Sequence, residues 1–220
     1  MIRTCSIVAV IASSAAVSFA AQSWTQPSGM SDNITYNSGQ TSFGRLEGGT
    51  PTVGPDAFVF TPTGFVATES GPTSVSDLLS VVINAKAGKQ IDRISTDLAG
   101  DYSFLGGSGN GNYSLKITNL DTSAVLTDAK LFPAFTGDDG TFNGIASIDL
   151  PNLWRNVLVE LSANVSVNSQ QQQSGAAAVE LKVASMSIDT VAAVPLPPAA
   201  LAAIPGIAVA YLARRKMLRS

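Results

Sequence analysis

The stretch from Val157 to Val167 constrains the fold of this chain more than any other. Its even-numbered positions are mostly polar, and its odd-numbered positions are all apolar: Val157, Val159, Leu161, Ala163, Val165 and Val167. Successive side chains of a β-strand point to opposite faces of a sheet, so this alternation predicts a strand with one buried and one solvated face. Antiparallel sheets that cover a core on one side have this character.

Shorter β-prone runs occupy much of the chain between residues 56 and 190. Glycine, proline and asparagine separate these runs, which lie at 57–61, 64–68, 81–85, 91–94, 113–118, 124–126, 130–132, 144–148 and 179–188. Roughly eight to ten short strands with such turns predict an all-β fold, namely an antiparallel β-sandwich or jelly-roll-like domain over residues 56–190.

Two short segments refine this expectation near the start of the domain. Pro62-Thr63 suits a tight hairpin between the first two runs. Ser76-Asp77 offers a capping residue, so Ser74–Leu79 could form a brief helical turn.

Later in the chain, the residues from Gly88 onward indicate a strand, a turn bracketed by Asp97 and Asp101, and a second strand. The apolar residues before and after Val183-Ala184 fall on opposite parity, and this phase change predicts a β-bulge or a bend there.

The segment 21–55 is rich in glycine, serine and threonine and has few apolar residues. We expect irregular structure there, with one strand around Ile34–Tyr36. Trp24 and Phe43 are the side chains expected to pin this segment to the domain.

The first 20 residues have the pattern of a secretory signal peptide. Arg3 is followed by an apolar run from Ile7 to Ala12 and by small residues that end in Ala20 and Ala21. A basic region, an apolar region and a small-residue cleavage site in this order predict export, with signal peptidase cutting after Ala20.

Residues 191–220 combine three features at the other end of the chain. A proline motif spans 194–198, an uncharged apolar run spans 199–213, and a basic tip spans 214–220; their key residues are Val194, Pro195, Leu196, Pro197, Arg214, Arg215 and Lys216. The apolar run has 15 residues, fewer than the roughly 20 that span a bilayer core as a helix. Val194 and Leu196 extend it enough to cross a thinned bilayer, with the basic tip left in the cytoplasm.

This order of parts resembles the PEP-CTERM sorting signal of Gram-negative bacteria, although the namesake glutamate is Leu196 here. The resemblance implies processing by a membrane-embedded exosortase near the prolines. It also implies transient membrane anchoring by a C-terminal hydrophobic helix, and then a place at the cell surface or in an extracellular matrix or biofilm with exopolysaccharide. An ordinary C-terminal membrane anchor is the alternative interpretation of these residues.

Loss of both terminal segments would leave 8 basic and 16 acidic residues, a net charge of about −8. Nucleic acid and anionic lipid are poor partners for such a chain. The chain has no histidine, and its one cysteine, Cys5, lies in the signal-peptide segment. Catalysis by serine or cysteine with histidine, and metal sites built on histidine, are therefore excluded, and no cofactor is implied.

Candidate site residues are few. Asp138 and Asp139, with Asp149 further along, are weak candidates for Ca²⁺ because carboxylates at a turn are hard oxygen ligands. Their spacing fits no calcium motif, and Asp-Asp-Gly is ordinary turn chemistry, so no metal site is assigned. Four aromatic residues could stack on sugars, although core packing suits most of them: Tyr102, Phe104, Tyr113 and Trp154. No catalytic or cofactor-binding residue is nominated.

Two functions fit these observations. The first is a non-catalytic structural protein of an exopolysaccharide or biofilm matrix, exported and processed by an exosortase. The alternative is a secreted carbohydrate-binding or carbohydrate-active domain that uses the same delivery system. A cleft with two facing carboxylates, or an exposed strip of aromatic side chains, would favour the alternative.

Overall fold

The computed structural model describes residues 21–46, 52–54, 56–104, 107–135, 139–151, 154–168 and 177–193. The expected signal peptide, the expected sorting signal from Val194 onward, and Asp138 lie outside these residues, whereas the first two residues of the segment 191–220 belong to the last strand. The described ranges contain no helix, and hence none that is long and apolar enough to cross a membrane.

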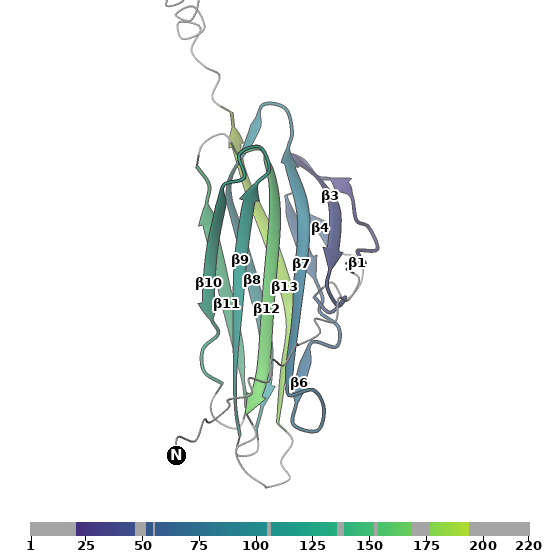
Figure 1. The fold of residues 1–220 in the computed structure, drawn as a ribbon, viewed down its shortest axis with the longest axis vertical. Coiled ribbons are helices and arrows are strands. Elements are labelled where there is room, and N and C mark those ends of the chain that lie inside the picture. Colours follow the sequence, from purple (N-terminus) through teal and green to yellow (C-terminus); the bar gives the residue numbers. More distant parts are fainter. Residues whose placement is uncertain are drawn as a thin grey trace, which may run out of the picture.

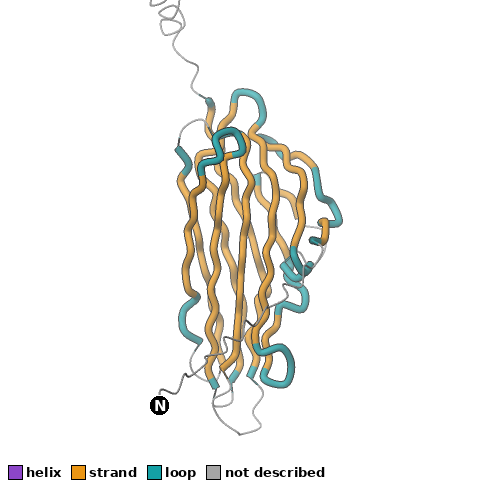
Figure 2. Tube along the Cα trace, in the orientation of Figure 1, coloured by secondary structure: helices purple, strands orange, loops and turns teal. Residues whose placement is uncertain are grey.

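The described residues form an elongated sandwich of two antiparallel sheets whose strands run along the long axis (Figures 1 and 2). The strands are β1 (Gln22–Ser23), β2 (Gly29–Met30), β3 (Ile34–Thr41), β4 (Thr52–Gly54), β5 (Ala57–Phe60), β6 (Val66–Thr68), β7 (Ser74–Ala85), β8 (Lys89–Ser103), β9 (Ser108–Asn119), β10 (Val125–Leu131), β11 (Asp139–Asp149), β12 (Asn156–Asn168) and β13 (Ala178–Ala192). The sandwich predicted from the sequence is confirmed.

We name each sheet after one of its inner strands. The β12 sheet has the order β1-β3-β7-β12-β9-β10, with β2 paired to β3, and the β8 sheet has the order β11-β8-β13-β5-β4, with β6 paired to β13. The alternating stretch found in the sequence is β12, which lies between β7 and β9. Its odd-numbered residues are buried and its even-numbered residues up to Ser166 are partly exposed, as predicted.

Three local expectations were wrong. The runs around Pro62-Thr63 do not form a hairpin, because β5 and β6 both pair with β13, at successive positions along that strand. Ser74–Leu79 is not helical but begins β7. The expected turn between Asp97 and Asp101 is absent, since β8 runs through both residues as one strand. In each case the alternation of buried residues across a sheet overrides a local turn or capping signal.

The β-bulge expected near Val183-Ala184 is confirmed. The pairing of β13 with β8 shifts register between Leu181 and Val183, so that Lys182 is the extra residue. Because of this extra residue, Ala184 points into the core, as Leu181 does, although the two residues have opposite parity.

The N-terminal segment is more regular than the sequence suggested. The expected strand at Ile34–Tyr36 extends to Thr41 and joins the β12 sheet beside β7. Trp24 is buried, as expected. The centroid of its ring lies 5.9 Å from the ring centroid of Phe58 and 5.2 Å from that of Phe60, both on β5. This segment therefore contributes core side chains to one half of the sandwich.

A second group of aromatic rings fills the other half of the core. The group contains Tyr102, Phe104, Tyr113, Phe132, Phe135 and Phe142. Gly144 makes room for two of these rings, because a Cβ there would lie 2.5 Å from Tyr113 Cε1 and 2.7 Å from Phe132 Cε1. The sequence had left Tyr113 and Phe104 open as sugar platforms, and the structure uses both as core.

Side chains form hydrogen bonds with backbone groups of β11, which is an edge strand of the β8 sheet. Tyr113 Oη and Lys130 Nζ donate to the Ile145 carbonyl at 3.2 and 2.8 Å, and Asp128 Oδ2 accepts from the Ser147 N–H at 3.0 Å. Exposed backbone groups on an edge strand invite pairing with another chain. These contacts close that part of the edge and join β11 to β10.

Asp56 joins the two sheets near the start of β5. Its carboxylate accepts hydrogen bonds from Ser31 Oγ at 2.6 Å, from the Asn33 N–H at 3.0 Å and from Asn33 Nδ2 at 2.5 Å. Burial acts to raise the pKa of Asp56, but these hydrogen bonds and the charge of Lys86 outweigh it and lower the pKa below its usual value.

We expect the Asp56 contacts to make the free energy of unfolding depend on pH. A carboxyl group with a lowered pKa in the folded state stabilises the protein above the pKa of the unfolded chain, and this contribution is lost as the pH falls through the folded-state pKa. When the pH falls from about 5 to about 2, the free energy of unfolding should therefore decrease by on the order of 1 kcal/mol less in Asp56→Asn than in the wild type. Asparagine tolerates the positive φ of 54° found at this position.

Urea unfolding of both proteins at each pH measures this difference. Parallel pH profiles for the wild type and Asp56→Asn would contradict the assigned role of the carboxylate.

Candidate functional site

Neutral polar side chains cover much of the outer face of the β12 sheet. They lie on β7, β12 and β9 and include Ser74, Ser76, Asn84, Asn156, Ser162, Asn164, Ser166, Asn110, Asn112, Ser114 and Thr118. Several contact one another: Ser114 Oγ and Ser162 Oγ are 2.8 Å apart, and Asn164 Nδ2 donates to Ser74 Oγ at 3.1 Å. An ion pair of 2.7 Å between Lys116 and Glu160 adds no net charge to this face.

Two adjoining depressions cross this face at right angles to the strands, and we call them together the transverse groove. One, of about 230 Å³, lies over β7 and β12; the other, of about 400 Å³, lies over β9 and β10. Asn112 and Ser162 line both depressions. The residues of the groove form two rows in register, Leu78-Ser162-Ser114-Ala129 and Ser76-Asn164-Asn112-Leu131.

Apolar side chains stand at the two ends of the transverse groove. Phe43 and Leu78 lie at the β7 end, and Leu131 lies at the β10 end with 78% of its surface exposed. Among the aromatic residues that the structure describes, Phe43 alone is exposed, at 36%. The Arg45 guanidinium lies 5.1 Å from the centroid of its ring, a cation–π contact that helps to order it.

Asp77 holds the loop that carries Phe43. Although it lies on a strand, Asp77 is only 3% exposed, and its carboxylate accepts from the backbone N–H groups of Phe43 at 2.9 Å, Arg45 at 2.7 Å and Leu46 at 2.9 Å. It also accepts from the N–H of Leu78 at 2.8 Å. A buried carboxylate with several N–H donors satisfies backbone groups that the turning chain would otherwise leave without partners. The position of Phe43 is therefore fixed from β7.

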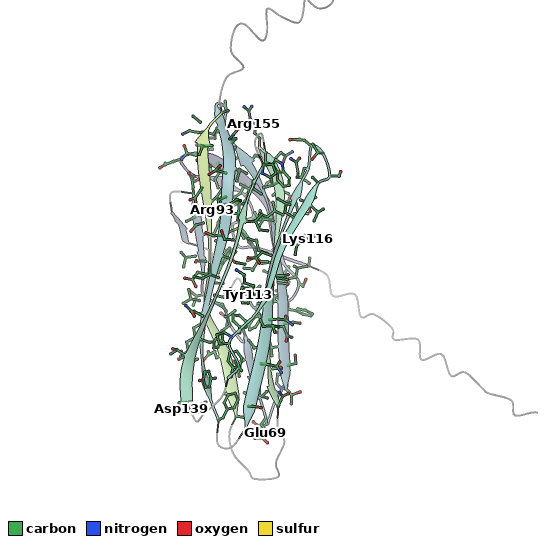
Figure 3. The ribbon with its side chains drawn as sticks, turned by 90° about the vertical axis from the view of Figure 1, so that its left-hand side faces the viewer. Glu69, Arg93, Tyr113, Lys116, Asp139 and Arg155 are labelled. Carbon is green, nitrogen blue, oxygen red and sulfur yellow. The ribbon has the colours of Figure 1, made fainter. Side chains whose placement is uncertain are left out.

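The outer face of the β8 sheet is acidic instead. Its carboxylates include Asp97, Asp101, Asp139, Asp149, Glu180 and Asp189, and its cations include Arg93 and Lys182. Figure 3 looks onto the β10–β11 edge, with Arg93 of the β8 sheet on the left and Lys116 of the β12 sheet on the right. The sandwich thus presents one neutral and one negatively charged face.

A second pair of depressions lies on the acidic face, of about 470 and 500 Å³, and both are lined by Asp101 and Thr141. Asp101 and Glu180 are direct cross-strand neighbours there. Lys182 donates a hydrogen bond to Asp101 and lies 4.0 Å from Glu180. The hydrogen bond to Asp101 and the negative charge of that carboxylate stabilise the ammonium form, so the pKa of Lys182 is raised. A glycosidase keeps the gap between its two carboxyl groups open for the glycosidic bond or water. Here an ammonium group contacts both carboxylates.

Two of the carboxylates singled out in the sequence, Asp139 and Asp149, do not come together. Asp139 and Asp149 lie at opposite ends of β11, about 30 Å apart by the rise of a strand. Asp149 Oδ1 is 2.5 Å from Arg93 Nε, at a level well removed from Asp139 (Figure 3). Within the described ranges no group of three or more acidic, histidine or cysteine residues could hold a metal ion.

Other residues named from the sequence fall into three sets. Phe104, Tyr113 and Trp154 are buried, and Tyr102 is partly buried against Phe104 and Phe135. Phe43, expected to pin a loop, instead exposes its ring. The processing residues from Val194 onward, and those up to Ala20, lie outside the described residues.

Comparison with known proteins finds only distant likenesses. No protein-family model and no curated protein matches the chain. The structure of infectious bursal disease virus Gt strain matches with a TM-score of 0.37 and 13% identity over 64% of this chain, which spans about a third, 33%, of that viral chain. TmCBM61, a carbohydrate-binding module in complex with β-1,4-galactotriose, matches with a TM-score of 0.29 and 10% identity, over 78% of this chain and 98% of that chain. Likenesses at these scores support no conclusion about function.

Proposed function

We propose that this protein is an exported, non-catalytic protein of an extracellular polysaccharide matrix, and that it contacts polysaccharide through the transverse groove. The observation that carries this proposal is the groove itself, in which hydroxyl and amide groups lie between exposed apolar side chains on a β-sheet. Carbohydrates present many hydroxyl groups that both donate and accept hydrogen bonds, and serine and asparagine do the same.

The terminal segments support the extracellular part of the proposal. The first 20 residues have the order of a signal peptide, and residues 191–220 have the order of an exosortase sorting signal. The contact of Lys182 with both Asp101 and Glu180 favours binding over hydrolysis. The groove thus favours carbohydrate binding, which is one part of the alternative function. We combine it with the matrix role of the first function.

Co-sedimentation with the exopolysaccharide of the host tests this function. The protein recovered from its host should pellet with the purified polysaccharide and should generate no new reducing ends. A control preparation from a host that makes no exopolysaccharide should leave the protein in the supernatant. Protein that stays in the supernatant with polysaccharide present, or polysaccharide that becomes shorter, would contradict the proposal.

A further inference from the structure

We infer that the transverse groove binds a neutral glycan chain that lies across the strands, with Phe43 as a stacking platform at one end. This inference rests on the proposed function and names the ligand class and the binding site. It is drawn from three features of the groove: the spacing of its polar groups, the absence of unengaged charge from its lining, and the contrast with the acidic face.

The spacing of the groove matches a polymer of sugars. Adjacent strands of a sheet lie about 4.8 Å apart. Polar groups repeat at this interval from β7 to β9 in one row, as Ser76, Asn164 and Asn112, and from β12 to β9 in the other, as Ser162 and Ser114. One sugar residue of an extended glycan has a similar length. A chain that crosses the strands would therefore bring successive sugars over Ser76, Asn164 and Asn112 in turn.

The hydrogen-bonding groups of the groove suit a neutral ligand. Ser114, Ser162 and Asn164 are partly exposed, and their hydroxyl and amide groups can donate to and accept from sugar hydroxyls. Asp77 also lines the groove, but it is 3% exposed and its carboxylate accepts from four backbone N–H groups within the protein. At the β10 end, Lys130 lies 3.0 Å from Asp128 and donates to a backbone carbonyl.

The ends of the groove supply the apolar contacts. The carbon-bound hydrogens on one face of a sugar ring pack on an aromatic ring. Phe43, which is 36% exposed and also contacts the Arg45 guanidinium, offers such a ring beside Ser76 and Leu78. Leu131 offers apolar surface at the far end. A glycan held by stacking at one end and by hydrogen bonds along its length needs no charge of its own.

The charge of the molecule favours the same ligand class. The acidic residues of the β8 sheet and the excess of carboxylates in the whole chain repel polyanions. A polysaccharide of uronic acids would meet this repulsion, and the cations near the groove are already engaged: Arg45 contacts the Phe43 ring, Lys130 pairs with Asp128, and Lys116 pairs with Glu160. We therefore expect selectivity for uncharged glycans.

Affinity gel electrophoresis of the protein recovered from its host tests the site. The gels contain glucomannan, galactan or polygalacturonate. The wild-type protein should be retarded by at least one of the two neutral polysaccharides and not by polygalacturonate. Phe43→Ala and Asn112→Ala should weaken that retardation at least about tenfold in apparent dissociation constant.

Two matched variants serve as controls. Asn84→Ala removes an amide from the same sheet outside the groove, and Asp101→Ala removes a carboxylate from the acidic face. Both should bind like the wild type, and all four variants should keep the wild-type circular dichroism spectrum.

The inference would be overturned by retardation in polygalacturonate alone, by no retardation in either neutral gel, or by groove variants that bind as tightly as the wild type. These results are distinct from failure of the proposed function, which would show as absence of the protein from the host's polysaccharide whatever the gels report.

Discussion

Replacement of Asp77 by alanine is expected to lower the free energy of unfolding by about 3 to 5 kcal/mol. Asp77 is 3% exposed, and its carboxylate accepts from four backbone N–H groups, three of them in the loop 43–46. Its removal leaves these donors without a partner at a site that water reaches poorly. The loop also carries Leu46, which is fully buried, so its release would open part of the core.

Urea unfolding of Asp77→Ala beside Asp97→Ala measures this effect. Asp97 is an exposed aspartate on a strand of the other sheet, so its replacement should change stability by less than about 0.5 kcal/mol. Equal effects for the two variants would show that the Asp77 contacts do not hold the loop. Because Phe43 lies on this loop, Asp77→Ala should also weaken binding in the transverse groove.

The second large effect is expected from Phe58→Ala, at about 3 to 5 kcal/mol. Phe58 is fully buried on β5. Its ring centroid lies 5.9 Å from the ring centroid of Trp24 and 5.0 Å from that of Tyr36. Trp24 and Tyr36 belong to the N-terminal segment, which packs with the β12 sheet, whereas β5 belongs to the β8 sheet. The substitution therefore leaves a cavity where the two sheets meet.

Thermal unfolding should show a fall in Tm of about 10 °C for Phe58→Ala. Phe43→Ala is the matched control, because it removes the same side chain from an exposed position and should leave the Tm almost unchanged. A small change for Phe58→Ala would indicate that the N-terminal segment contributes little to the core.

Much of the fold follows from alternation in the sequence. The pattern from Val157 to Val167 identifies a strand with one solvated face, and the change of parity at Val183-Ala184 locates a bulge. Both depend on residues that are close together in the chain. The errors at Pro62-Thr63 and at Ser74–Leu79 arise because pairing with distant strands decides whether a local turn signal is used.

The transverse groove was less accessible to sequence reasoning. The solvated face of β12 was visible in Ser162 and Asn164, and it was the one signal that pointed to the groove. Asn112 and Leu131 continue the row of Asn164, and this placement depends on the register of β9 and β10. The exposure of Phe43 depends on Asp77, 34 residues away in the chain. Contacts at this separation leave no periodicity in a single sequence.

The central claim is that this sandwich is exported, processed and left in a polysaccharide matrix. The intact mass of the protein recovered from its host, with mapping of its C-terminal peptide, tests the claim most directly. We expect a chain that begins at Ala21 and ends between Val194 and Pro198 in the matrix fraction, and a longer chain when the host's exosortase is deleted. A protein that still ends at Ser220 in the membrane fraction of the wild-type host would contradict the claim and make the tail an ordinary anchor.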